Sequence, residues 1–247
     1  MLFSSIVFLL YFFPLVFFLY YMLSFSRMLQ NILLLVSSLV FYAWGEPVYV
    51  FLMIGSIIFN SIMGYSIQYT KRSVMRKAEL FITVVINLGV LFVFKYLGFV
   101  LKSIGTAANM DFTFFQISLP IGISFFTFQA LSYVVDVYRG TTKAENPFYV
   151  GLYISFFPQL IAGPIIQYNT IADQIRNRKS SFDKLSLGLC RFTTGLGKKI
   201  LLSNCFATIA DNIFQWSAIG TDRLPIPVML AWLGSIAYTL QIYFDFS

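Results

Sequence analysis

The sequence predicts an all-α fold: a polytopic integral membrane helix bundle of about seven spans with one re-entrant, broken segment. The first observation is composition. Hydrophobic residues make up 58% and charged residues 11% of the 247 residues, against about 45–50% and about 25% in soluble domains. The second is a mean hydropathy of +0.79. The third is that apolar residues gather in blocks of roughly 20, the length that crosses a hydrocarbon core. We expect a single membrane domain over residues 1–247.

Seven blocks with few or no charges are the expected spans. The first could be a signal peptide, but no basic residue precedes it and it is longer than a signal-peptide core, so we interpret it as a span. The blocks cover residues 2–26, 28–45, 47–70, 80–101, 117–135, 200–214 and 224–244.

An eighth apolar block, 148–168, contains Pro158, Gly163 and Pro164 in its middle. Proline in a helix interior costs about 3 kcal/mol or more, and broken backbone at membrane depth occurs only inside protein or along a wet cavity. A re-entrant block leaves all but three of the 17 basic residues in the cytoplasm. A spanning block moves seven more of them outside, so the positive-inside rule favours the re-entrant interpretation.

The basic residues are expected to mark the cytoplasmic side. The net charge is +7, and the stretch 71–79 has four basic residues in nine, typical of a cytoplasmic loop. We expect no nucleic-acid partner. Residues 182–200 combine leucines at helical spacing with lysines and arginines, which fits either a helix in the membrane interface or a buried connector.

Polar residues inside apolar blocks are the candidate functional residues, because they are costly there and usually face a cavity or a helix interface. Asn60 and Asn87 are interpreted mainly as interhelical hydrogen-bonding residues. Gln159 and Asp245 each coincide with a break in the helix pattern. The chain contains no histidine, the commonest general base, and Cys190 and Cys205 show no metal-binding spacing. No complete catalytic set is therefore visible, and no metal is expected.

Several motifs of the chain resemble the membrane-bound O-acyltransferase family, within it the branch of alginate O-acetylases and of relatives that acylate peptidoglycan and teichoic acids. The resemblance runs through the whole chain in order. The motifs are "FYAWGEP" (41–47), "LPIGISFFTFQALSYVVDVYRG" (119–140), "FFPQLIAGPIIQY" (156–168), "GLGKKILLSN" (195–204) and "LGSIAYTLQIYFDFS" (233–247).

The resemblance implies transfer of an acyl group, usually acetyl, to hydroxyls of an exported polysaccharide such as alginate or a cell-wall polymer. It implies no bound cofactor. The donor, such as acetyl-CoA or an acyl carrier, comes from the cytoplasmic side. The implied location is the bacterial inner (plasma) membrane, crossed several times, and the implied partners are the lipid bilayer and extracytoplasmic acyl-transfer proteins.

The resemblance also implies candidate site residues and a truncation. The interrupted segment matches the family's tunnel entrance, and the last motif matches the region beside the catalytic chamber. The family's catalytic histidines follow this motif, so we expect the chain to be an N-terminal half that is inactive alone. The tunnel or chamber candidates are Pro158, Gln159, Gly163, Pro164, Tyr238, Gln241, Tyr243 and Asp245.

Two other functions stay open from the sequence. Broken helices and intramembrane polar groups also occur in transporters and flippases, although no second, related half is visible. A non-catalytic membrane scaffold for polysaccharide modification is the other alternative.

Overall fold

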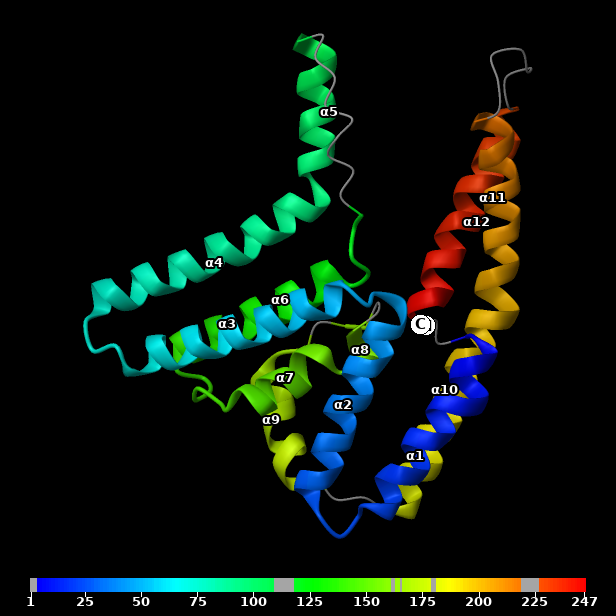
Figure 1. Cartoon of the computed structure of the whole chain (residues 1–247). Helices are drawn as coiled ribbons and strands as arrows, with labels where there is room; N and C mark the ends of the chain where they lie inside the picture. Colours follow the sequence, from blue (N-terminus) through cyan, green and yellow to red (C-terminus); the bar gives the residue numbers. More distant parts are fainter. Residues whose placement is uncertain (1–3, 109–117, 161–162, 165, 179–180, 219–226) are drawn as a thin grey trace. The chain divides into compact units, whose positions relative to one another are not determined.

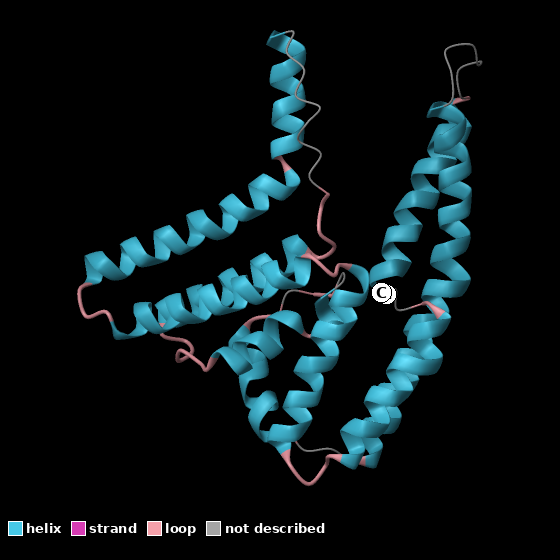
Figure 2. Cartoon of the chain, in the orientation of Figure 1, coloured by secondary structure: helices cyan, strands magenta, loops and turns pink. Residues whose placement is uncertain are grey.

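The protein folds into helices that form two compact units in a computed structural model (Figure 1). The structure describes residues 4–108, 118–160, 163–164, 166–178, 181–218 and 227–247. None of these residues lies in a strand (Figure 2), so the prediction of an all-helical fold is confirmed. The first unit comprises Leu10–Arg178, and the second comprises the described residues of Lys179–Ser247 together with residues 4–9. The single membrane domain stays a prediction.

The first unit contains three helices that are long and apolar enough to cross a membrane. They are α2 (Arg27–Gly45), α3 (Tyr49–Tyr69) and α4 (Ser73–Lys95), which agree with the expected spans 28–45, 47–70 and most of 80–101. An apolar helix of 15 residues, Phe8–Met22, lies where a span over 2–26 was expected. The helices of the first unit are α1 (Phe13–Met22), α2 (Arg27–Gly45), α3 (Tyr49–Tyr69), α4 (Ser73–Lys95), α5 (Leu97–Ala108), α6 (Ile123–Arg139), α7 (Pro147–Ser155), α8 (Phe157–Leu160) and α9 (Tyr168–Asn177). A π-helical turn, η1 (Phe8–Phe12), precedes α1, and its first two residues are assigned to the second unit.

The core of the first unit lies where α3, α6 and α7 pack together. Tyr133 of α6 is fully buried, and its ring lies against Gly64 of α3, where an added Cβ would come within 2.8 Å of the Tyr133 hydroxyl. A small residue here lets the two helices approach closely. Asn60 and Asn87 exchange amide hydrogen bonds of 3.1 and 2.9 Å between α3 and α4, as expected for interhelical contacts.

Helix α4 differs from the expectation at both ends. It begins at Ser73, so most of the expected loop 71–79 is helical, and Glu79 accepts hydrogen bonds from Ser66 and Thr70 of the preceding helix end. It ends at Lys95, and α5 runs in a different direction (Figure 1). The expected single span 80–101 is therefore wrong beyond Lys95. Tyr96 leaves the regular helix there, with its N–H still bonded to the Phe92 carbonyl at 2.8 Å.

The second unit is built from α10 (Phe182–Gly197), a π-helical segment η2 (Lys198–Ser203), α11 (Asn204–Ala218) and α12 (Val228–Phe246). The first three form one uninterrupted helical run, so no boundary separates the expected interfacial helix from the expected span 200–214. No residue of α10 is buried, which does not support the buried-connector alternative. Helices α11 and α12 lie side by side, and Gly234 permits this because an added Cβ would lie 2.9 Å from Ile213.

The count of seven spans stays a prediction. Only three helices among the described residues meet the length and hydropathy of a membrane span. The beginnings of the expected spans 117–135 and 224–244 lie outside the described residues.

Candidate functional site

The break predicted within the block 148–168 is present in the first unit. Helix α7 ends at Ser155, α8 has only four residues, and α9 begins at Tyr168. Pro158 lies in the first turn of α8, where proline is tolerated because its missing N–H has no helical partner there. Gly163 and Pro164 follow outside any helix. The prediction of a broken segment is confirmed, and its re-entrant course in the membrane stays a prediction.

Side chains satisfy backbone groups that this break leaves without a helical partner. The Phe157 N–H donates to Ser38 Oγ of α2 at 3.1 Å. The Tyr153 hydroxyl donates to the Ile166 carbonyl at 2.6 Å, and the Gln159 amide donates to the Pro164 carbonyl at 2.7 Å. Backbone polar groups away from water need such partners. Gln159 thus has a direct role in holding the segment.

Gly163 is required by close packing rather than by an unusual backbone angle. An added Cβ would lie 2.5 Å from the Gln159 carbonyl oxygen and 2.7 Å from the Gln159 Cα. Both atoms belong to the backbone of the break and cannot move aside as a side chain can. The sequence around the break therefore fixes its conformation.

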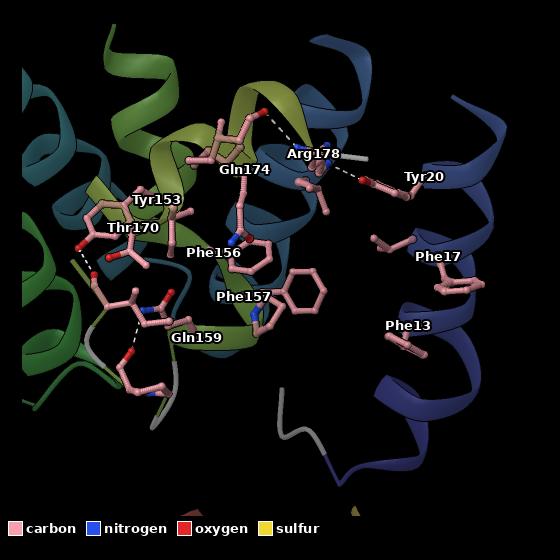
Figure 3. Close-up of a pocket in the computed structure, with 18 of the residues that line it drawn as sticks. Phe13, Phe17, Tyr20, Tyr153, Phe156, Phe157, Gln159, Thr170, Gln174 and Arg178 are labelled. Carbon is pink, nitrogen blue, oxygen red and sulfur yellow. Dashed lines mark hydrogen bonds between the residues drawn. The ribbon is translucent and has the colours of Figure 1, made fainter. Parts of the chain in front are cut away.

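A cavity of about 640 Å³ lies beside the broken segment, within the first unit. Aromatic side chains of α1 form one wall, and aromatic side chains of α7 and α8 with their connection form the opposite wall (Figure 3). Three of the four predicted residues of this segment, Pro158, Gln159 and Pro164, line the cavity, and Gly163 does not. The aromatic residues of the two walls are Phe13, Phe17, Tyr20, Tyr21, Tyr153, Phe156 and Phe157.

Arg178 is the only charged residue that lines this cavity among the described residues. Its Nη1 donates to Asn31 Oδ1 at 2.7 Å and to the Ile175 carbonyl at 3.2 Å, and its Nε donates to the Tyr20 hydroxyl. Its Nη2 is buried and has no hydrogen-bond partner among the described residues. Figure 3 shows Arg178 and Tyr20 together at one end of the cavity.

The second unit holds the other four predicted residues, all on α12. Asp245 accepts a hydrogen bond from Ser203 Oγ at 2.7 Å and forms an ion pair with Lys199. Beside it, Lys198 Nζ donates to Ser247 Oγ at 2.9 Å. Three of these partners come from η2, a π-helical segment of a kind that occurs frequently at functional sites. We call Lys198, Lys199, Ser203, Asp245 and Ser247 the carboxylate cluster.

The remaining α12 candidates have different environments. The main-chain carbonyl of Gln241 accepts a hydrogen bond from Ser203 Oγ of η2 at 3.2 Å. Its side-chain Oε1 is buried with no partner among the described residues. Tyr238 packs its ring edge-to-face with Phe214 of α11. Tyr243 is 62% exposed, and its ring packs edge-to-face against that of Phe244.

The structure thus gathers the eight candidates into two sets, each within its own unit. Sequence reasoning missed Arg178, which was counted only as a cytoplasmic charge, and missed Asn31 altogether. It also missed Lys199 and Ser203 as site residues, although both lie in the motif "GLGKKILLSN". Only the helical pairing of η2 with α12 brings them to Asp245.

Comparison with known proteins bears on both sets. The model of the membrane-bound O-acyltransferase family matches residues 145–247, which include the broken segment, η2 and α12. The whole chain is 40% identical to the "Probable alginate O-acetylase AlgI" of Pseudomonas aeruginosa and 39% identical to that of Pseudomonas syringae pv. tomato, covering 47% of each. It is 30% identical to the "Peptidoglycan O-acetyltransferase" of Helicobacter pylori, covering 52% of that protein.

The chain therefore spans about half the length of the curated relatives it matches. No solved structure matches it.

Proposed function

Because the chain belongs to the membrane-bound O-acyltransferase family, we propose that it forms part of an enzyme that O-acetylates an exported polysaccharide. The observation that carries this proposal is the similarity of the entire chain to alginate O-acetylases and to a peptidoglycan O-acetyltransferase. Both groups of relatives are named for transfer of acetyl to a polymer. Identity is higher to the alginate O-acetylases, which favours an alginate-like acceptor over a cell-wall polymer.

The setting of this reaction in the proposal is the bacterial inner membrane. Three helices of the first unit are long and apolar enough to cross a bilayer. The donor, acetyl-CoA or an acyl carrier, approaches from the cytoplasm, and extracytoplasmic acyl-transfer proteins act on the polymer. Seven spans and a re-entrant segment at 148–168 belong to the same proposal, supported by the charge distribution along the sequence.

The proposal gives the two sets of candidate residues different roles. The broken segment supplies architecture, because its polar side chains are occupied by its own backbone. In the proposal, the carboxylate cluster lies beside the reacting groups, and Asp245 positions the donor or the acceptor through Lys199 and Ser203. Positioning of this kind matters greatly, since a misplacement of about 1 Å can cost roughly 100-fold in rate.

The chain supplies no imidazole, because it contains no histidine. A hydroxyl acceptor needs a general base, and histidine most often serves as one. The relatives are about twice as long as this chain, and in the proposal a polypeptide like their unmatched half supplies the general base. The chain by itself then lacks acetyl transfer.

Reconstitution in liposomes tests the proposal. The purified chain receives radiolabelled acetyl-CoA and deacetylated alginate, with and without a polypeptide that carries the unmatched half of the Pseudomonas aeruginosa relative. We expect label in the polymer only when both polypeptides are present. The matched control replaces the chain with the corresponding half of the relative itself.

Two results contradict the proposal. Acetyl transfer by the chain alone shows that the missing imidazole is not needed. Transfer by the control pair, without transfer by the pair that contains this chain, shows that the chain does not have the proposed function. A scaffold without a part in the chemistry gives this second result.

A further inference from the structure

The cavity of the first unit has the size of a ligand site and a largely apolar lining. Its volume of about 640 Å³ falls within the roughly 300–1,000 Å³ of small-molecule sites. Phenylalanine rings from α1 face phenylalanine rings of the α7–α8 segment (Figure 3). A two-carbon acyl group needs little of this apolar wall, whereas a long hydrocarbon chain can contact all of it.

One end of the cavity carries a positive charge that lacks a full set of partners. Arg178 is held by Asn31, Tyr20 and the Ile175 carbonyl, all of them uncharged. No carboxylate lines the cavity among the described residues, and Nη2 is buried without a partner there. A guanidinium with a free nitrogen binds phosphate through charge-assisted hydrogen bonds. The uncharged partners of Arg178 fix the orientation of its guanidinium group without neutralising its charge.

We propose that this cavity binds an anionic phospholipid of the surrounding membrane, with one acyl chain between the aromatic walls and the head-group phosphate on Arg178. The proposal does not rest on the acetyl-transfer function. Two features of the cavity support it: the apolar walls suit a lipid acyl chain, and the uncompensated charge of Arg178 suits a phosphate.

The location of the cavity supports a lipid as the occupant. Helix α1, which forms one wall, exposes Leu15 and Phe18 by 59% and 67%, so its outer face is suited to hydrocarbon. The re-entrant interpretation of residues 148–168 predicts that Arg178 lies on the cytoplasmic side, where anionic lipid is attracted to basic residues. Basic sites between membrane helices on this side bind anionic head groups.

Native mass spectrometry of the purified chain in detergent micelles tests the proposal. The probes are dioleoyl phosphatidylglycerol and dioleoyl phosphatidylcholine, which have the same acyl chains and differ in net charge. We expect one phosphatidylglycerol per chain, bound about tenfold more tightly than phosphatidylcholine, because the choline ammonium cancels the charge of the phosphate that would face Arg178.

Two variants locate the site. Arg178→Gln should lower the affinity for phosphatidylglycerol about tenfold, to that for phosphatidylcholine. Gln174→Trp should abolish binding of both lipids, because Gln174 lines the cavity yet is exposed, so a large ring there enters the cavity without disturbing the core. The matched control is Lys143→Gln, which removes an exposed positive charge of the same unit outside the cavity and should change nothing.

Unfolding temperatures in lipid-free detergent show whether each variant is folded. If Arg178→Gln does not fold, Gln174→Trp still tests whether the lipid occupies this cavity. Equal binding of the two lipids by the unmodified chain overturns the proposal. Undiminished phosphatidylglycerol binding by Gln174→Trp also overturns it, because the lipid is then elsewhere. Binding of oleate without binding of phosphatidylglycerol identifies a free fatty acid as the ligand and contradicts the phospholipid assignment.

Discussion

The broken segment and the carboxylate cluster are both polar interruptions in apolar sequence, but they are held in opposite ways. In the broken segment, side chains bond backbone groups: Gln159 and Tyr153 donate to carbonyls five and 13 residues away, and Ser38 of α2 accepts from the Phe157 N–H. In the carboxylate cluster, side chains bond other side chains 42 to 49 residues away. The first arrangement fixes a chain path, and the second fixes the position of charged groups. Substitutions in the first should therefore act on stability, and substitutions in the second on activity.

The largest effect expected is from Gly163→Ala. The new Cβ lies 2.5 Å from the Gln159 carbonyl oxygen and 2.7 Å from its Cα, which are backbone atoms with little freedom to move. We expect a loss of about 1–3 kcal/mol, as for overpacked cores. The measurement is thermal unfolding of the purified chain in detergent, where each kcal/mol corresponds to a shift of about 2–4 °C.

Gly188→Ala is the matched control in the other region. Gly188 lies within α10, and an added Cβ meets nothing within 4 Å. Alanine is a better helix former than glycine by about 1 kcal/mol, so this variant should unfold at the same or a higher temperature. Equal destabilisation by both substitutions would mean that close packing at Gly163 is not what holds the break.

A smaller loss is expected from Gln159→Leu. The substitution preserves much of the side-chain volume but leaves the Pro164 carbonyl without its donor at 2.7 Å. We expect a cost of about 1–2 kcal/mol in the same unfolding measurement. The control is Gln174→Leu, which also lines the cavity but is exposed and should change stability by less than about 0.5 kcal/mol. A neutral Gln159→Leu variant contradicts the architectural role.

The smallest effect on stability is expected at the carboxylate cluster. The Lys199 and Asp245 side chains are 39% and 25% exposed, so solvent screens their attraction. A double-mutant cycle with Lys199→Met and Asp245→Asn should give a coupling of about 0.2–1 kcal/mol. A coupling of several kcal/mol would show that this pair is a structural element, and the contrast between the two regions would be lost.

The sequence could predict features that depend on local composition. Uncharged runs placed α2 and α3 to within two residues of their observed ends, because a span must be apolar along its whole length. Pro158, Gly163 and Pro164 placed the break, because they disrupt helical hydrogen bonding locally. Interhelical hydrogen bonds of Asn60 and Asn87 were expected because an amide without a partner is costly in a membrane helix, but the sequence did not indicate that the two residues bond to each other.

Features that depend on distant contacts could not be read in the same way. The change of direction at Tyr96 has no proline nearby, so the apolar run 80–101 gave no sign of it. The basic stretch after Lys71 was interpreted as a loop, yet Arg76 and Lys77 are good helix formers and α4 includes them. The pairing of Lys199 with Asp245 requires α12 to lie against η2, and the orientation of Arg178 requires Asn31 and Tyr20 of two earlier helices.

The contrast between the broken segment and the carboxylate cluster is tested most directly by the rate of acetyl transfer per folded molecule. The rate is measured for this chain reconstituted with the complementary half of the relative. The account predicts that Asp245→Asn lowers this rate roughly ten- to 100-fold with little loss of stability. It predicts that Gln159→Leu lowers the amount of folded protein but leaves the rate of each folded molecule close to that of the unmodified chain. An unchanged rate for Asp245→Asn, together with a reduced rate per folded molecule for Gln159→Leu, would contradict it.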